Sequence, residues 1–228
     1  DEELRDIAEV QSKFFSSEKS IIYHSHPIHG SCETDEVYTK AYSRENMDHD
    51  RSVYFRRKRA RMQKKYGIKL AIGIPLTDEM VYRHFFFSFV KVITEYMSGL
   101  VKAGKPISFD VLMPDFPCQI DAARNNIVNQ ALNIGCTHIL FMDSDQIYST
   151  DNMIEKMLAH DKPVLGARVH RRYPPFDPLL LLGEPGKLTQ VKDEDIKNPD
   201  GTFKTELHVD YTGTGCIMYD MQIFNDMI

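Results

Sequence analysis

Two carboxylates stand one residue apart in the segment Phe141-Met-Asp143-Ser-Asp145. The apolar run before them is typical of a buried strand, so both would lie at its carboxyl end, where open α/β sheets bind ligands. Carboxylate oxygens suit Mg²⁺ or Mn²⁺, and such a cation can neutralise a diphosphate. The alternative is that Asp143 and Asp145 only end the strand and make hydrogen bonds within the turn.

Cationic side chains accompany two other element ends. Arg124 stands at the start of an expected helix, where a guanidinium and free backbone amides favour a phosphate or a base edge. Its alternative role is a surface ion pair with Asp121. A second group follows an expected strand and comprises Arg168, His170, Arg171 and Arg172. This group would contact a diphosphate or an anionic acceptor, with His170 as a third metal ligand, or would form a solvated basic turn.

The elements that position these residues are expected to form an α/β sheet, because short apolar runs alternate with helical patterns from residue 68 onward. The expected strands are residues 69–75, 107–113, 138–142, 163–167, 207–211 and 215–219. Helices are expected at residues 85–100, at 121–135 and after the polar cluster 149–151. Residues 183–202 lack apolar periodicity and are expected to form a surface loop. The pattern at 221–228 resembles a helix cut in mid-course, so we expect a fragment of a longer protein.

Residues 1–66 differ in composition from the rest, and we expect a polar N-terminal extension followed by one domain at 67–228. Residues 44–66 carry nine basic and three acidic side chains. Such a run binds nucleic acid or anionic lipid in some proteins, but it is more often a solvated face. A second cluster, within residues 24–32, contains His24, His26, His29 and Cys32, and its spacing matches no standard zinc finger.

Composition limits the class of protein. The 228 residues carry 28 Lys and Arg against 33 Asp and Glu, so the net charge of -5 gives no sign of a polyanion binder. The longest aromatic and aliphatic stretch is far shorter than the roughly 20 residues that span a bilayer. The four cysteines are widely separated and form no CxxC, which favours a reducing compartment, and we expect the cytoplasm.

The order of these motifs resembles the nucleotide-sugar glycosyltransferases of the GT-A fold, particularly their family-2-like members. The resemblance covers residues 68–228 and rests on the helix opening Ala123-Arg124-Asn125, the strand that leads to Asp143-Ser-Asp145, and the turn Gly213-Thr-Gly215. It implies a mixed, mostly parallel, Rossmann-like sheet flanked by helices. It also implies transfer of a sugar from a nucleoside-diphosphate donor to an acceptor hydroxyl, with Mn²⁺ or Mg²⁺ as the cofactor.

The resemblance also implies roles for single residues. Asp143 and Asp145 match the metal-binding pair, and Asp143 is also placed to contact the donor. Other donor-side matches are Ile74, Pro75, Asp115, Arg124, Arg171, Gly213 and Gly215. Of these, Pro114-Asp115-Phe-Pro117 departs from the usual form around the base-reading acid. The glycines would supply positive backbone torsions and close approach, or would form an ordinary β-turn.

The catalytic base is expected at Asp210, as a general base or as a contact to the acceptor hydroxyl. The acidic pair that usually holds the base in inverting members is missing from this sequence. Two other functions stay open at this point. A nucleotidyltransferase needs the same metal, carboxylates and nucleotide pocket. A non-catalytic module would use the basic segment 44–66 to hold nucleic acid or an anionic surface.

Overall fold

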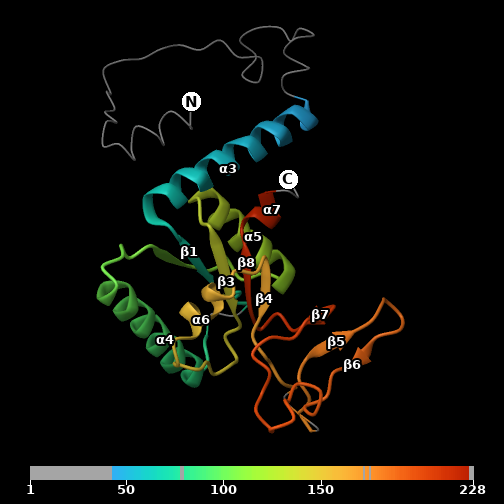
Figure 1. The fold of residues 1–228 in the computed structure, drawn as a ribbon. Coiled ribbons are helices and arrows are strands. Elements are labelled where there is room, and N and C mark those ends of the chain that lie inside the picture. Colours follow the sequence, from blue (N-terminus) through green and yellow to red (C-terminus); the bar gives the residue numbers. More distant parts are fainter. Residues whose placement is uncertain (1–42, 78–79, 172, 175, 226–228) are drawn as a thin grey trace, which may run out of the picture.

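Five strands form a central mixed sheet in the computed structural model, which describes residues 43–77, 80–171, 173–174 and 176–225. The strands are β1 (Leu70–Gly73), β2 (Phe109–Leu112), β3 (His138–Met142), β4 (Val164–Gly166) and β8 (Cys216–Asp220). Their order is β2-β1-β3-β8-β4, and β8 runs antiparallel to both of its neighbours while the other four run in one direction (Figure 1). The predicted mixed, mostly parallel and Rossmann-like α/β class is confirmed.

Both faces of the central strands are buried, which explains why their sequences read as continuous apolar runs. Alternate residues enter two separate cores because side chains along a strand point to opposite faces. One core receives Leu70, Ile72, Leu140 and Met142, and the other receives Ala71, Ile139 and Phe141. A Cβ at Gly73 would lie 2.8 Å from Ile127 Cγ2, so this glycine allows the helix beneath it to approach closely.

Helices cover the two faces of the sheet (Figure 1). On one face lie α4 (Arg83–Lys102) and α6 (Met153–Ala159), and on the other lie α5 (Ile120–Asn133) and the short α7 (Gln222–Asn225). The strands and helices expected between residues 69 and 167 are thus confirmed, with ends shifted by a few residues. Over the described ranges, none of the helices combines the length and apolar composition needed to cross a bilayer.

The basic segment at residues 44–66 forms the helix α3 (Arg44–Tyr66). The Ser43 side chain caps it by accepting a hydrogen bond from the backbone amide of Asn46. Phe55 is 4% exposed and packs in the core that contains Ile127. The composition of this segment is dominated by its nine basic residues, so it gave no sign that Phe55 would be buried. The division near residue 66 stays a prediction, and the histidine cluster at residues 24–32 lies outside the described residues.

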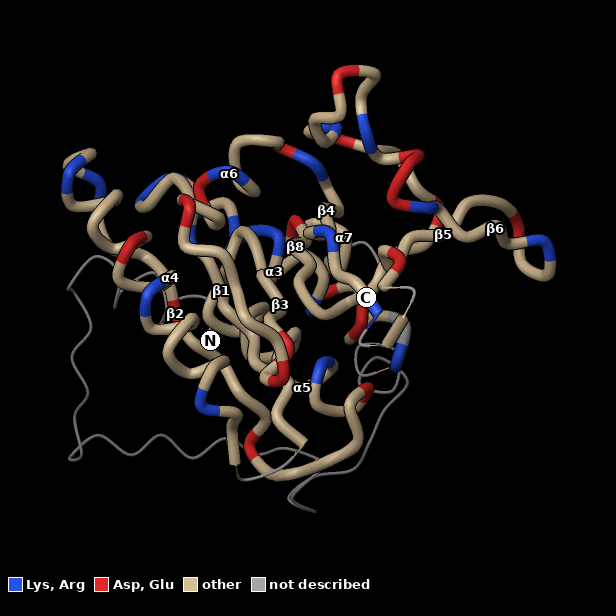
Figure 2. The backbone as a smooth tube through the Cα atoms, turned by 90° about the horizontal axis from the view of Figure 1, so that it is seen from below, with Lys and Arg blue, Asp and Glu red and all other residues tan. Residues whose placement is uncertain are grey.

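A second, smaller sheet projects beside β4, as Figures 1 and 2 show. It has the order β6-β5-β7 and consists of β5 (Leu180–Leu182), β6 (Thr189–Gln190) and β7 (Tyr211–Thr212). The expected loop at 183–202 therefore contains a strand, and it buries Val191 and Ile196. The strand expected at 207–211 is wrong, because only Tyr211 belongs to a strand, and that strand pairs with β5 instead of the central sheet.

Candidate active site

The carboxyl ends of β1, β2 and β3 meet at one edge of the central sheet. Gly73 pairs with Leu112 on one side and with Phe141 on the other, so the three strands end at the same level. This register brings Ile74 and Pro75, which are both buried, beside the start of the segment that carries Asp143. The sheet thus brings together candidate residues that are about 70 positions apart in the sequence.

Arg124 and Asp143 form an ion pair at this edge. Arg124 Nη2 lies 2.9 Å from Asp143 Oδ1, and the two side chains are 24% and 27% exposed. The close approach of α5 to β1 at Gly73 places the first turns of this helix beside the end of β3. Asp121 is exposed, and the Arg124–Asp121 pair considered for the sequence is not formed. The structure therefore joins two residues that were singled out independently.

The backbone of the Asp143 segment is held from behind by Tyr148 and Gly215. The Asp143 amide donates to the Gly215 carbonyl at 2.9 Å. The Tyr148 hydroxyl donates to the carbonyl oxygens of Asp143 at 2.9 Å and of Gly215 at 2.7 Å. Burial raises the pKa of Tyr148 far above its ordinary value, so the phenol stays a neutral donor. These hydrogen bonds fix the backbone position from which the Asp143 side chain projects. Asp145 lies two residues further along the chain and is exposed.

A neutral thiol lies next to this carboxylate. Burial, and then the neighbouring charge of Asp143, raises the pKa of Cys216 to about 12. Cys216 therefore keeps its proton at neutral pH and adds no negative charge to the edge. The thiol is also buried, at 2% exposure, which makes it a packing residue of the site.

The two glycines of the predicted turn allow close packing, but they do not supply positive torsions. Neither Gly213 nor Gly215 has a positive φ, which corrects that expectation. A Cβ at Gly215 would lie 2.0 Å from Gln146 Nε2, and one at Gly213 would lie 3.2 Å from Leu179 Cβ. The Gln146 side chain from the Asp143 segment thus lies on the Gly215 backbone and would have to shift for any larger residue there.

Asp115 lies beyond β2 and is held against α5. Its carboxylate accepts from Asn126 Nδ2 at 3.0 Å and from Gln130 Nε2 at 3.4 Å. Gln130 also donates to the backbone carbonyl of Met113 at 2.9 Å. These contacts orient Asp115, which is exposed, at the outer end of the same sheet edge. Asn126 and Gln130 stand four residues apart on one helix face, and that spacing was the signal that could have identified them.

The remaining candidates contact the smaller sheet. Arg171 donates to Gln190 Oε1 at 2.9 Å, and His170 Nε2 lies 3.5 Å from Asp193 Oδ1. Asp210 Oδ2 accepts from the Gly183 amide at 2.7 Å, in the turn after β5. Within the described ranges, no three His, Cys, Asp or Glu side chains are grouped closely enough to hold a metal ion. His170 is therefore not brought together with the two aspartates of the candidate metal pair.

A cavity of about 650 Å³ is lined by β4 and by residues of the segment 196–212. Its walls include Arg168, Phe203, Glu206, Asp210 and Tyr211. The Arg168 guanidinium lies over the Phe203 ring, 3.8 Å from the ring centroid. Because β4 ends at the same edge as β3, the cavity adjoins the side of the sheet on which the donor candidates gather. Its mixture of aromatic, acidic and basic groups is suited to a polar ligand.

Asp143 and Asp145 fit a hard divalent cation by their chemistry. Such ions accept carboxylate oxygens and usually complete their coordination with water and substrate phosphates, so two protein carboxylates are enough. Tyr148 and Gln146, which position this segment, were missed in the sequence. Both lie within five residues of Asp143, and a buried aromatic residue in a polar segment was the available signal.

Comparison with known proteins points to the same part of the chain. A family model described as Anp1 matches residues 118–178, and Anp1 is a family of mannosyltransferase-related glycosyltransferases. The matched segment contains α5, β3, α6 and β4, and with them Arg124, Asp143 and Asp145. A search of the curated proteins finds no match. The family match supports glycosyltransferase activity in general.

Proposed function

We propose that this protein is a metal-dependent glycosyltransferase of GT-A type that transfers a sugar from a nucleoside-diphosphate sugar to an acceptor hydroxyl. The observation that supports the proposal most directly is the Arg124–Asp143 ion pair at the carboxyl edge of the sheet, inside the segment that matches the glycosyltransferase family. An arginine and a pair of aspartates at one sheet edge provide the charges that a diphosphate and its cation require.

The donor side follows from this edge. A Mg²⁺ or Mn²⁺ ion on Asp143 and Asp145 would neutralise the charge that develops on the leaving diphosphate. Arg124 would donate to a phosphate oxygen, and the Tyr148 hydroxyl keeps the Asp143 backbone in place while the charge shifts. The ends of β1 and β2, with Ile74, Pro75 and Asp115, would then line the nucleobase.

The acceptor side would use the cavity between β4 and residues 196–212. Asp210 lines that cavity, which supports its role as the general base or as a contact to the acceptor hydroxyl. A base must first be released from its present partner, the Gly183 amide. Arg171 and His170, in the segment that follows β4, would contact an anionic group of the substrate.

The proposal is tested by calorimetry of the purified chain against UDP, GDP, CDP and their sugars, with and without Mn²⁺. Mannose is the first sugar to include, because the matching family is related to mannosyltransferases. We expect metal-dependent binding of one nucleoside diphosphate, lost in Asp143→Asn and Asp145→Asn. Asp121→Asn is the matched control, since Asp121 is an exposed aspartate near the same helix end. Unchanged binding in both site variants would refute the proposal.

The reaction products separate this function from a nucleotidyltransferase. A sugar transferase releases a nucleoside diphosphate, whereas a nucleotidyltransferase releases pyrophosphate. Binding to nucleic acid through residues 44–66 would instead weaken steeply with salt and would survive both aspartate substitutions.

A further inference from the structure

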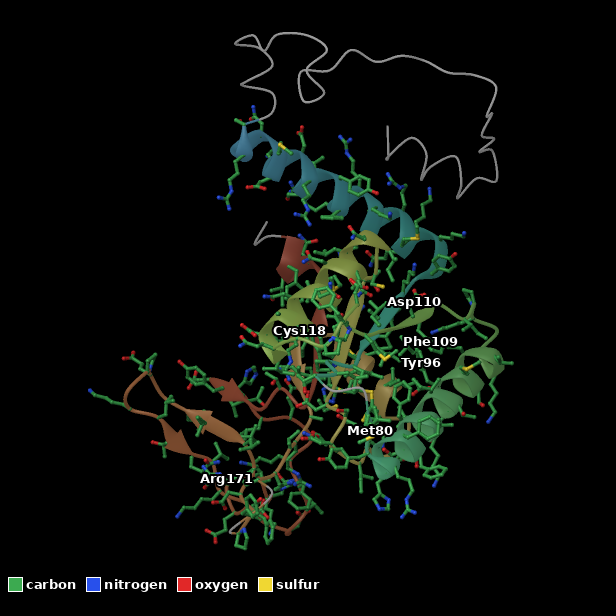
Figure 3. The ribbon with its side chains drawn as sticks, turned by 180° about the vertical axis from the view of Figure 1, so that it is seen from behind. Met80, Tyr96, Phe109, Asp110, Cys118 and Arg171 are labelled. Carbon is green, nitrogen blue, oxygen red and sulfur yellow. The ribbon has the colours of Figure 1, made fainter. Side chains whose placement is uncertain are left out.

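Helix α4 is apolar on two opposite faces. Its inner face packs on the sheet through Phe85, Val92 and Tyr96, which are 2–3% exposed. An outer apolar face remains in solvent and comprises Tyr82, Phe86, Phe87, Val90, Met97 and Val101, each between 37% and 68% exposed. Met80, which Figure 3 labels just before the helix, is 84% exposed. The inner face alone accounts for the packing of α4 in the fold.

The outer apolar face forms a stripe along the helix, with the exposed Thr94 and the half-buried Ile93 between Val90 and Met97. With 3.6 residues per turn, Phe86, Val90, Met97 and Val101 fall within one narrow sector of the helix surface. An exposed apolar stripe is unusual on a helix whose other apolar face already packs in the core, and α4 lies at the periphery of the molecule (Figure 1). The stripe is therefore suited to contact with an apolar surface other than the core of this fold.

The exposed charged residues of α4 itself are basic. Arg83, Lys91 and Lys102 are exposed, and the last turn ends in Lys102. The helix has one acid, Glu95, which is half-buried and accepts a hydrogen bond from the Asn152 amide at 3.0 Å. The two acidic residues that precede Met80, Asp78 and Glu79, lie outside the described residues. Exposed aromatic residues combined with lysine and arginine are typical of helices that bind the interface of an anionic bilayer.

We propose that the outer apolar face of α4 docks on an anionic membrane surface. A symmetric contact with a second copy is disfavoured, because a two-fold axis on this face would set its basic residues against one another. The first turn of α4, which carries Phe86 and Phe87 on its outer side, lies close to the candidate active site through its inner residue Phe85. The Phe85 ring makes an edge contact with the ring of Tyr148 at 6.1 Å between centroids, and Tyr148 holds the Asp143 segment. Docking would thus bring the carboxyl edge of the sheet near the lipid.

Cosedimentation of the full chain with vesicles tests this proposal. One vesicle type contains phosphatidylcholine alone, and the other contains phosphatidylcholine and phosphatidylserine. We expect binding to the second type that weakens with salt. The double variant F86S/F87S should bind roughly tenfold or more weakly, because each exposed phenylalanine would otherwise be buried in lipid. Lys91→Ala should weaken binding about fivefold, since one basic residue near the surface is lost.

Leu188→Ser is the matched control, because Leu188 is 41% exposed and directly precedes β6, which lies on the opposite side of the molecule from α4 (Figures 1 and 2). It should bind as the unchanged chain does. The proposal is overturned by equal binding to both vesicle types, by no binding to either, or by unchanged binding in F86S/F87S. It is also overturned if F86S/F87S abolishes self-association in sedimentation equilibrium instead of vesicle binding. If that double variant fails to fold, Lys91→Ala with Lys102→Ala provides the same test through charge alone.

Discussion

The central sheet and the smaller sheet differ in how they are supported. Leu70, Ile72 and Leu140 of the central sheet are completely buried between two layers of helices. In the smaller sheet, Leu182 and Tyr211 are each 42% exposed, and Val191 and Ile196 of the adjoining loop supply the buried apolar groups. Figure 2 shows many charged residues along the chain around β5 and β6. One region is a packed scaffold, and the other is a polar surface element with little core.

This difference divides the candidate site into a part on the central sheet and a part on the smaller sheet. The donor-side residues Arg124 and Asp143 project from elements that are fixed by the central core, and their side chains are about three-quarters buried. Asp210 and Arg171 instead make their contacts within the smaller sheet. A rigid scaffold combined with an adaptable surface region is a common arrangement for sites that bind one constant and one variable ligand.

The largest expected effect is a loss of folding stability caused by a substitution in the central sheet. Leu140→Ala should lower the free energy of unfolding by about 2–5 kcal/mol, because it removes buried methyl groups and leaves a cavity between β3 and the helices α4 and α6. Leu182→Ala in the smaller sheet should cost about 0.5 kcal/mol or less, because that side chain is partly solvated. Urea unfolding followed by circular dichroism measures both. Equal losses would contradict the difference in support between the two sheets.

The second prediction separates the chemistry of the two regions. Asp143→Asn should reduce turnover by about 10²–10³-fold, because it removes a charge that stabilises the transition state. It should also abolish metal-dependent binding of the nucleotide. Asp210→Asn should keep that binding and lose transfer to the acceptor. Nucleotide binding that is lost in Asp210→Asn and kept in Asp143→Asn would reverse the assignment of the two sides.

A smaller effect is expected from Tyr148→Phe. This change removes the hydroxyl that bonds the carbonyls of Asp143 and Gly215, and it should cost about 1–3 kcal/mol of stability. The Asp143 carbonyl loses this donor, whereas the Gly215 carbonyl keeps the Asp143 amide. The nucleotide affinity should fall as well, since the Asp143 segment loses an anchor. Tyr211→Phe, at an exposed position of the smaller sheet, is the control and should change neither quantity in thermal unfolding and calorimetry.

The smallest expected effect is a pH dependence of folding stability that arises from His138 in the central sheet. Burial lowers the pKa of His138 below its ordinary value of 6.5, although the nearby Asp220 acts in the opposite direction. The folded protein then binds fewer protons than the unfolded chain. The stabilising contribution is complete above about pH 6.5 and is lost as the pH falls through the folded pKa. Unfolding free energies measured on both sides of this window should show the loss, and His138→Gln should reduce it. An unchanged slope in His138→Gln would assign the dependence to other groups.

Much of the scaffold was predictable because its strands and helices carry local signals. The run before Asp143 is apolar since both of its faces are buried, and the spacing of Ile127 and Ala131 reports the inner face of α5. The smaller sheet was only partly predictable. Its strands are two or three residues long, too short for a period to emerge, and its pairings join residues such as Leu180 and Thr212 across a long loop.

By itself, the sequence determined the α/β class, the succession of the central strands and helices along the chain, and the carboxylates at the end of β3. Periodicity and residue type, on which these predictions rest, are local properties. Only the tertiary structure decided that Arg124 pairs with Asp143 and not with Asp121, that Tyr148 and Gly215 hold the segment between them, and that His170 and Asp210 turn toward the smaller sheet. The physical reason is that each of these contacts depends on strand register and helix approach. These are properties of the whole packed core, which no local spacing encodes.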